Sequence, residues 1–125
     1  MERILVIEDD ALLRGAIRIV LESAGYEVLD AADGDAGLRL HREQGADLVV
    51  VDLYMPERDG LEVIREVRAE APQSKIIAMS GGGGLKFDLL DAATAFGASR
   101  TLLKPFQPRE LLTAIREVLG EGAPS

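Results

Sequence analysis

The stretch Asp47-Leu48-Val49-Val50-Val51-Asp52-Leu53-Tyr54-Met55-Pro56 decides how the rest of the chain is interpreted. Its aliphatic run, with three consecutive valines, lacks the polar alternation of a half-exposed strand and predicts a strand covered on both faces. The run ends at Asp52, and ligands bind at the carboxyl ends of buried parallel strands in open α/β sheets. Asp52 is therefore a candidate functional residue. Aspartate also caps turns and helices, so a structural role stays open for Asp52 taken alone.

Length and composition predict one globular domain. The chain has 125 residues, 47% of them hydrophobic, and no cysteine, which excludes a disulfide framework and a thiolate metal site. No apolar run approaches the roughly 20 residues of a membrane span, and the run at 4–7 is too short for a signal peptide. We therefore expect a cytoplasmic protein with no membrane partner. A formal net charge of −8 also disfavours direct binding of nucleic acid through its phosphates.

Five aliphatic segments alternate with five segments of helical periodicity. We predict strands at 4–7, 26–32, 47–52, 75–80 and 100–104, and helices at 13–24, 35–44, 60–71, 85–96 and 108–119. This alternation is typical of βαβ units with right-handed crossovers. The predicted fold class is α/β, a (βα)5 doubly wound, five-stranded parallel sheet with strand order 2-1-3-4-5. Residues 1–120 are assigned to this domain and residues 121–125 to a short polar tail.

Polar side chains stand at the ends of four predicted strands. Glu8 and Asp9 follow the first strand, Asp52 ends the third, Ser80 ends the fourth and Lys104 ends the fifth. Because the carboxyl ends of parallel strands meet at one edge of the sheet, we expect these side chains to converge. Each has an ordinary structural alternative, such as helix-dipole compensation by an acid or capping by a serine. Chance does not readily place all of them at one edge.

The chemistry of these side chains indicates a metal-assisted phosphoryl site. Three converging carboxylates repel one another unless a cation lies between them, and oxygen ligands without imidazole or thiolate suit Mg²⁺ or Mn²⁺. A lysine and a hydroxyl suit a bound phosphoryl group. The glycine run that starts at Gly81 allows backbone N–H groups to approach an anion closely. An aspartate can itself be the nucleophile and form an aspartyl phosphate.

Four motifs carry a resemblance to a known family. They are Ile-Leu-Val-Ile-Glu-Asp-Asp at 4–10, Asp-Leu-Tyr-Met-Pro at 52–56 with Asp59-Gly60, Ser80, and Leu-Leu-Lys-Pro-Phe at 102–106. In this order and at these distances they resemble the response-regulator receiver domain of two-component signalling, the CheY-like family. The resemblance covers residues 4–119. It implies a flavodoxin/CheY-like fold and a single-domain regulator that acts as a phosphorylation-dependent signalling switch.

The resemblance implies a metal site at the acidic residues. Asp52 would be the phospho-acceptor nucleophile and, together with Asp9, would bind Mg²⁺ (or Mn²⁺) directly. Glu8 would reach the metal through water, and the main-chain carbonyl of Tyr54 would be a further ligand. Asp10 lies beyond this pair of acids and is expected to cap the following helix.

The resemblance also implies how the phosphoryl group is held and supplied. Its oxygens would contact the Ser80 hydroxyl, the Gly81 N–H and the Lys104 ammonium, and the Lys104–Pro105 peptide would be cis. A histidine kinase or a histidine phosphotransfer protein would donate the phosphoryl group, and an unidentified protein target would receive the signal. Self-dephosphorylation would reset the switch at a rate set by Tyr54 and Gly82. No turnover of a separate substrate is expected, and the chain would be a monomer or a weak dimer.

One position departs from the family pattern. Receiver domains usually carry Tyr or Phe three residues before the lysine, where the ring changes rotamer with the serine or threonine, but here that switch position is Thr101. A small β-branched side chain cannot sweep between buried and exposed positions as a ring does. We therefore expect the glycine run at 81–84 and the following helix to report phosphorylation. Four consecutive glycines carry a large ordering entropy, which favours a change of order in this run.

Two further observations lie away from the predicted site. His41 is the only histidine, and the sequence favours a solvated surface position for it. Leu85, Phe87, Leu89 and Leu90 are dense for a helix with one buried face. Core packing explains most of them, and a partner-binding or dimer patch is the alternative.

Other functions remain open on the sequence alone. A flavodoxin-like electron carrier shares the fold, but the acids at 8–10 would repel a flavin phosphate. A phosphatase with an aspartyl nucleophile usually needs a second aspartate two residues on, where this chain has Tyr54. A degenerate receiver that acts only as a protein–protein module is a third alternative. The chain could also be the receiver fragment of a larger regulator.

Overall fold

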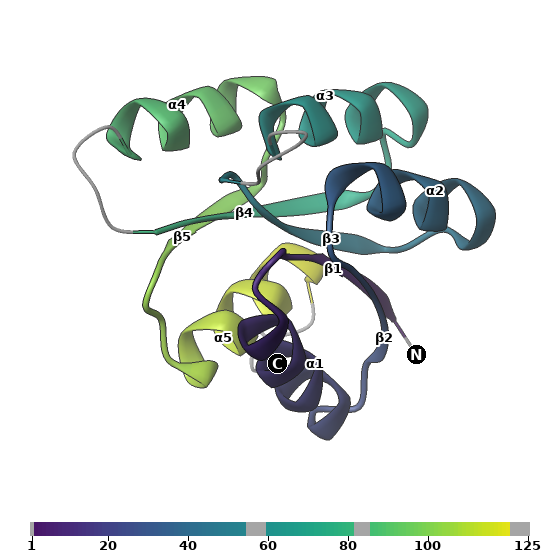
Figure 1. The fold of residues 1–125 in the computed structure, drawn as a ribbon, viewed down its shortest axis with the longest axis vertical. Coiled ribbons are helices and arrows are strands. Elements are labelled where there is room, and N and C mark those ends of the chain that lie inside the picture. The colour runs from purple at the N-terminus through teal and green to yellow at the C-terminus, as the bar shows by residue number, and fades with distance from the viewer. Residues whose placement is uncertain (1, 55–59, 82–85, 121–125) are drawn as a thin grey trace.

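The computed structural model describes residues 2–54, 60–81 and 86–120, which form a five-stranded parallel sheet with helices on both faces (Figure 1). The strands are β1 (Arg3–Ile7), β2 (Glu27–Ala31), β3 (Leu48–Asp52), β4 (Lys75–Ser80) and β5 (Arg100–Leu103). The helices are α1 (Ala11–Ser23), α2 (Gly34–Gln44), α3 (Gly60–Glu70), α4 (Lys86–Phe96) and α5 (Pro108–Leu119). The strand order β2-β1-β3-β4-β5 confirms the predicted fold class.

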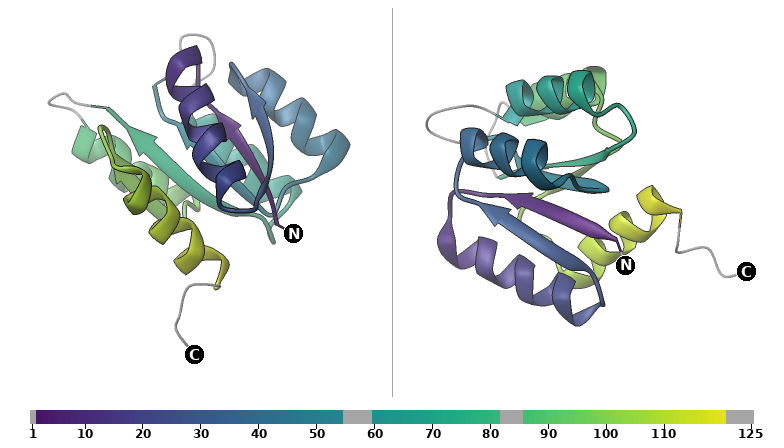
Figure 2. Two further views of the ribbon diagram at one scale, coloured as in Figure 1. Left: turned by 90° about the horizontal axis from the view of Figure 1, so that it is seen from below. Right: turned by 90° about the vertical axis from the view of Figure 1, so that its right-hand side faces the viewer.

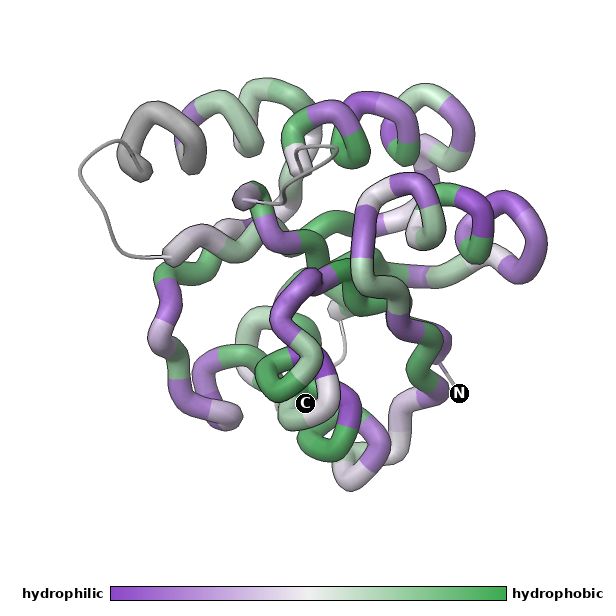
Figure 3. Tube along the Cα trace, in the orientation of Figure 1, coloured by the Kyte–Doolittle hydropathy of each residue, from purple (hydrophilic) through white to green (hydrophobic). Residues whose placement is uncertain are grey.

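The sheet separates two hydrophobic cores. Helices α1 and α5 cover one face, and α2, α3 and α4 cover the other, as the turned views in Figure 2 also show. Leu48 and Val50 of β3 belong to the core under α1 and α5, whereas Val49 and Val51 belong to the core under α2 and α3. All four side chains are fully buried, and Figure 3 shows hydrophobic residues along the central strands. Each buried valine or leucine contributes roughly 1.5–3 kcal/mol, which makes β3 the central element of both cores.

The register of the two central strands aligns their functional ends. Ile7 of β1 pairs with Val51 of β3. Glu8 and Asp52 therefore come next at the same level of the sheet, immediately beyond the paired aliphatic residues. A one-residue slip would turn the alternating side chains to opposite faces, so the aliphatic pattern that forms the cores also places these two acids together.

Asp10 begins helix α1 as its N-cap. Its Oδ1 accepts hydrogen bonds from the backbone N–H groups of Leu12 and Leu13, at 3.0 and 3.3 Å. These bonds satisfy two of the backbone donors that a helix leaves free at its start. Asp10 is therefore a structural acid, as predicted, and Asp9 is left at the sheet edge.

Gly60 allows the start of α3 to lie directly against the end of β3. A Cβ atom at this position would lie 2.4 Å from the main-chain oxygen of Asp52 and 2.8 Å from the Cα of Leu53. The Gly60 N–H also donates to the Leu53 carbonyl at 3.2 Å. Because backbone atoms cannot move aside as a flexible side chain can, only glycine fits here without displacing Asp52.

The surface position predicted for His41 is wrong. His41 is 8% exposed, and its Nε2 lies 3.0 Å from Ser74 Oγ. The buried positions of α2 are Gly34, Gly37, Leu38 and His41. The ring is accommodated because Ser74 supplies a polar partner inside the protein.

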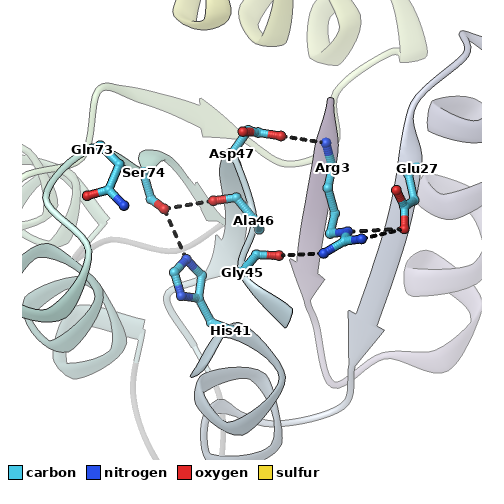
Figure 4. A pocket seen from close by; sticks show the side chains of 8 residues that line it. All are labelled: Arg3, Glu27, His41, Gly45, Ala46, Asp47, Gln73 and Ser74. Carbon is cyan, nitrogen blue, oxygen red and sulfur yellow. Dashed lines mark hydrogen bonds and ion pairs between the residues drawn. The ribbon is translucent and has the colours of Figure 1, made fainter. Parts of the chain in front are cut away.

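His41 lies at the edge of the sheet opposite the ends of β1 and β3. Ser74 Oγ donates to the Ala46 carbonyl at 2.7 Å, so the serine hydroxyl oxygen can accept a hydrogen bond from His41 Nε2–H (Figure 4). These groups border a cavity of about 360 Å³, together with Arg3, Glu27, Gly45, Asp47 and Gln73. The hydrogen-bond pattern assigns the Nε2–H tautomer to a neutral His41.

We predict that His41 makes the protein less stable as the pH falls. Burial lowers the pKa of His41 below its ordinary value of 6.5, although the nearby Glu70 carboxylate opposes this effect. The unfolded chain therefore binds the proton more readily, and stability present above pH 6.5 is lost as the pH falls toward the pKa of the folded state. Urea unfolding of the wild type and His41→Gln between neutral and mildly acidic pH measures this. The wild type should lose more free energy of unfolding than the variant; equal losses would contradict the prediction.

Several predictions fall outside the described residues. They concern Met55, Pro56 and Asp59 of the motif after Asp52, Gly82 and the rest of the glycine run, and the residue Leu85. The side chains of Phe87, Leu89 and Leu90 also lie outside the described part of the chain. Among the described residues, no helix is both long enough and apolar enough to span a membrane.

Candidate functional site

Three carboxylates meet at the carboxyl end of the sheet. One oxygen from each of Glu8, Asp9 and Asp52 lies within 4.8 Å of the other two. Glu8 and Asp52 are buried, at 1% and 3% exposure, whereas Asp9 is exposed to solvent. One open side and a set of oxygen donors without imidazole or thiolate fit a hard divalent cation that keeps some of its water. The convergence predicted for these acids is confirmed.

Lys104 compensates part of the negative charge of this cluster. Its Nζ lies 2.7 Å from Glu8 Oε1 and 3.4 Å from Asp52 Oδ2. Burial alone would lower the pKa of Lys104, but the hydrogen bond to Glu8 and the charge of Asp52 outweigh burial and raise it. The ammonium is therefore charged at neutral pH, and it bridges the two buried carboxylates.

Lys104 does not fully compensate the negative charge of the buried acids. Burial raises the pKa of Asp52, and the charge of Lys104 offsets this only in part. Burial also raises the pKa of Glu8, despite hydrogen bonds from Lys104 and from the Asp10 N–H at 3.1 Å. Three carboxylates face one ammonium, so a further cation at this edge would relieve their repulsion. This electrostatic imbalance supports the fit of a divalent metal.

Ser80 presents a hydroxyl group without a partner. The residue is fully buried at the end of β4, and its Oγ has no hydrogen bond within the part of the chain that the structure describes. Its main-chain carbonyl accepts from the Lys104 N–H at 2.7 Å, which ties the ends of β4 and β5 together. Because an unsatisfied buried hydroxyl is unusual, Ser80 is a candidate donor to a ligand at this edge. Gly81, which follows it, is half-buried, and apart from its chain neighbours no described residue has an atom within 4 Å of the position of an added Cβ.

Tyr54 lies beside the predicted nucleophile. Its backbone N–H donates to Asp52 Oδ1 at 3.3 Å, and its side chain is 50% exposed. The backbone contact orients the carboxylate of Asp52. The metal contact assigned to the Tyr54 carbonyl stays a prediction.

Two further predictions concern β5 and the residues after it. Thr101, at the predicted switch position, is half-buried and pairs with Ala78 of β4; the altered switch assigned to it stays a prediction. The Lys104–Pro105 peptide is cis, as predicted. The role predicted for the glycine run cannot be compared, because residues 82–84 lie outside the described ranges.

Sequence reasoning missed the contact that Arg14 makes with this edge. Its Nη1 donates to the main-chain oxygen of Glu8 at 2.8 Å. An arginine in the second turn of an amphipathic helix has no sequence pattern that distinguishes it from a solvated residue. The close approach of Gly60 to Asp52 was also not predicted, although Asp59-Gly60 belonged to a motif.

Comparisons with known proteins agree with this arrangement. The chain matches the family model for the response regulator receiver domain over residues 4–116. It is 39% identical over 122 residues to a probable transcriptional regulator, ycf27, of Porphyridium aerugineum, covering 94% of this chain and 48% of that protein. It is 33% identical over 118 residues to the chemotaxis protein CheY of Thermotoga maritima, covering 94% and 97% of the two chains.

Solved structures show the same fold. A CheY-like response regulator receiver domain protein from Methanospirillum hungatei aligns with a TM-score of 0.89 and 30% identity, covering 97% of this chain and 95% of that one. A receiver domain protein from Clostridium thermocellum aligns with a TM-score of 0.87 and 33% identity, covering 96% and 95%. The chain spans about half the length of the ycf27 regulators that it matches. The protein belongs to the response regulator receiver domain family of two-component systems.

Proposed function

We propose that Asp52 accepts a phosphoryl group from a phosphohistidine of a sensor kinase or a histidine phosphotransfer protein, and that the chain signals its state to a protein target. The observation that carries this proposal is the buried Ser80 hydroxyl, which has no hydrogen-bond partner among the described residues, at the sheet edge where Lys104 Nζ lies 3.4 Å from Asp52 Oδ2. A site for acids and a metal alone has no use for a buried hydroxyl and a lysine. A phosphoryl group uses both, as a hydrogen-bond acceptor and as an anion.

The reaction forms one bond and breaks one bond at phosphorus. A carboxylate oxygen of Asp52 attacks the phosphorus in line, and the P–N bond to the donor imidazole breaks. The imidazole leaves with the electron pair of that bond and takes up a proton. Lys104 then shares its charge between Glu8 and the new phosphoryl oxygens, and the Ser80 hydroxyl donates to one of them. Water later attacks the phosphorus, the P–O bond to Asp52 breaks, and inorganic phosphate leaves as the Asp52 carboxylate is restored.

The carboxylates of Glu8, Asp9 and Asp52 would hold the divalent cation. When bound, Mg²⁺ supplies positive charge that neutralises the transferring phosphoryl oxygens. Apart from this, the chain's own side chains act on the phosphoryl group. Because Asp52 would itself receive and later lose the phosphoryl group, we infer self-phosphorylation and self-dephosphorylation without turnover of another compound.

A small phosphodonor tests this function without a partner protein. In acetyl phosphate and Mg²⁺, the wild type should gain one phosphoryl group, measured as intact mass, and Asp52→Asn should gain none. A wild type without any gain would count against the proposal and favour a degenerate receiver. A gain in both proteins would place the phosphoryl group elsewhere.

An exposed leucine at the rim of the site suits contact with the donor protein. Leu12, in the first turn of α1, is 87% exposed. A cavity of about 360 Å³ nearby is lined by Leu13, Lys104, Pro105 and Phe106. The phosphohistidine must come within bonding distance of Asp52, so apolar groups beside it bury surface against the protein that carries it. We infer that this rim is part of the donor-docking surface.

We predict that Leu12→Glu slows phosphorylation by protein donors only. A charge in an apolar contact costs about 1–3 kcal/mol, or roughly 5- to 150-fold in rate at low concentration. Phosphorylation of the variant by acetyl phosphate should keep the wild-type rate, because Leu12 contacts no reacting atom. Both rates can be followed by intact mass, with any histidine kinase found to phosphorylate the wild type. Equal losses with both donors would show damage to the site rather than to docking.

A further inference from the structure

The peptide between Glu8 and Asp9 joins two of the three acids of the site, and contacts outside the acidic cluster hold it in place. The Glu8 N–H donates to the Ala31 carbonyl at the end of β2, at 3.1 Å. The carbonyl of the Glu8–Asp9 peptide accepts from Arg14 Nη1 at 2.8 Å. Because a peptide unit is planar, a bond to its oxygen constrains the Cα atoms at both of its ends. Arg14 therefore restrains the backbone that carries both carboxylates.

Arg14 is itself held by a residue of β2. Its Nε lies 3.6 Å from Asp30 Oδ1, and the side chains of Arg14 and Asp30 are only 21% and 28% exposed. The planar guanidinium presents its donors in a rigid fork, so Nε and Nη1 contact Asp30 and Glu8 at the same time. The backbone of Arg14 belongs to the first turns of α1, and its N–H donates to the Asp10 carbonyl at 2.8 Å. One side chain thus connects β2, α1 and the residue that follows β1.

Arg18 provides a matched comparison within the same helix. Its Nη1 pairs with Asp30 Oδ2 at 2.5 Å, and its Nε pairs with Glu22 at 3.0 Å. Arg14 and Arg18 therefore share one partner, Asp30, and differ in the second. Arg14 contacts the Glu8 carbonyl, whereas Arg18 contacts a carboxylate of its own helix. Replacing Arg18 removes a charge and ion pairs from α1 only, whereas replacing Arg14 also removes a contact with Glu8. A comparison of the two variants therefore separates these effects.

Two possible roles of Arg14 predict opposite changes of metal affinity when the residue is removed. As a simple cation near the acids, Arg14 would compete with a divalent metal, and its removal would tighten metal binding. As a positioning residue, it would keep the acids in place, and its removal would weaken metal binding. The carboxylate of Asp30 offsets the charge of Arg14, which reduces the electrostatic effect and leaves the hydrogen bond to Glu8. Groups that orient ligands in this way typically change metal affinity by about 10- to 100-fold.

We propose that Arg14 is a positioning residue that fixes the Glu8–Asp9 peptide for binding of a divalent cation by the receiver site. This inference rests on the proposed function, because that function assigns the cation to Glu8, Asp9 and Asp52. According to this inference, Arg14 of helix α1 and Asp30 of the edge strand β2 also support the metal site. Arg14 touches neither the phosphoryl group nor the metal and acts through the backbone of Glu8.

Calorimetric titration of Mg²⁺ into the metal-free protein tests the proposal without any phosphodonor. The wild type, Arg14→Ala, Arg14→Lys and Arg18→Ala are compared at one pH and ionic strength, at a temperature where circular dichroism shows each to be folded. Arg14→Ala should raise the Kd for Mg²⁺ about tenfold. Arg14→Lys keeps the charge but loses the planar fork, so its Kd should lie between those of the wild type and Arg14→Ala. Arg18→Ala should bind Mg²⁺ as the wild type does.

Three outcomes would overturn the inference. Arg14→Ala could bind Mg²⁺ as tightly as the wild type or more tightly, or Arg18→Ala could be weakened equally. If Arg14→Ala does not fold, Arg14→Lys decides, and an affinity equal to that of the wild type would again overturn it. A wild type that binds no Mg²⁺ would overturn the proposed function as well, whereas equal affinities of the wild type and the Arg14 variants would overturn only the inference.

Discussion

Lys104→Met is expected to slow phosphorylation by acetyl phosphate about 100-fold, the effect of removing one group that stabilises charge in a transition state. The ammonium lies 3.4 Å from Asp52 Oδ2, within reach of a phosphoryl group on that oxygen. The substitution should also lower the free energy of unfolding by about 3 kcal/mol in a metal-free buffer, since it leaves Glu8 and Asp52 buried without their cationic partner. Intact mass over time measures the rate, and urea denaturation measures the stability.

Lys75→Met is the matched control for this experiment. Lys75 also belongs to a strand, but its side chain is exposed at the opposite edge of the sheet. The Lys75→Met variant should keep the wild-type rate of phosphorylation and the wild-type stability. A Lys104→Met protein that gains phosphoryl groups as fast as the wild type would exclude Lys104 from the reaction. Wild-type stability of that variant would show that its ion pairs with the buried acids contribute nothing net.

Gly60→Ala is expected to lower the free energy of unfolding by about 1–3 kcal/mol, the usual cost of overpacking. The added Cβ would lie 2.4 Å from the main-chain oxygen of Asp52, so either α3 or the end of β3 must move. A movement of the end of β3 displaces the Asp52 carboxylate from Lys104, so phosphorylation by acetyl phosphate should slow as well. Thermal or urea unfolding and intact mass measure the two effects.

The control for a general glycine effect is Gly15→Ala. Gly15 lies inside α1, and apart from the helix's own backbone and the chain neighbours, no described residue has an atom within 4 Å of the position that its Cβ would take. Alanine should stabilise the helix there by up to about 1 kcal/mol. If Gly60→Ala were as stable as the wild type and as quickly phosphorylated, Gly60 would have no part in placing Asp52.

The fold could be predicted because its signals are local and repeated. The run at 48–51 has no polar residue and must be buried on both faces, which only a central parallel strand allows in a chain of this pattern. Parallel topology then brings together residues that lie far apart in the sequence, such as Glu8 and Lys104, whose side chains are 2.7 Å apart. The site was predictable for the same reason, since strand ends share one edge.

Features that depend on pairs of side chains could not be predicted in this way. The buried position of His41 depends on Ser74, which precedes another strand, and a weakly apolar helix does not reveal which face is buried. The contact of Arg14 with the Glu8 carbonyl depends on the angle at which α1 leaves β1. Neither partner can be identified from spacing along the chain.

Reductive trapping tests the central claim most directly, because it identifies the residue that carries the phosphoryl group. Borohydride reduces an aspartyl phosphate to homoserine, which peptide mass spectrometry can locate. After treatment with acetyl phosphate and Mg²⁺, we predict homoserine at position 52 and unchanged aspartate at positions 9 and 10. Reduction at another aspartate, or at none, would contradict the assignment of Asp52 as the phospho-acceptor.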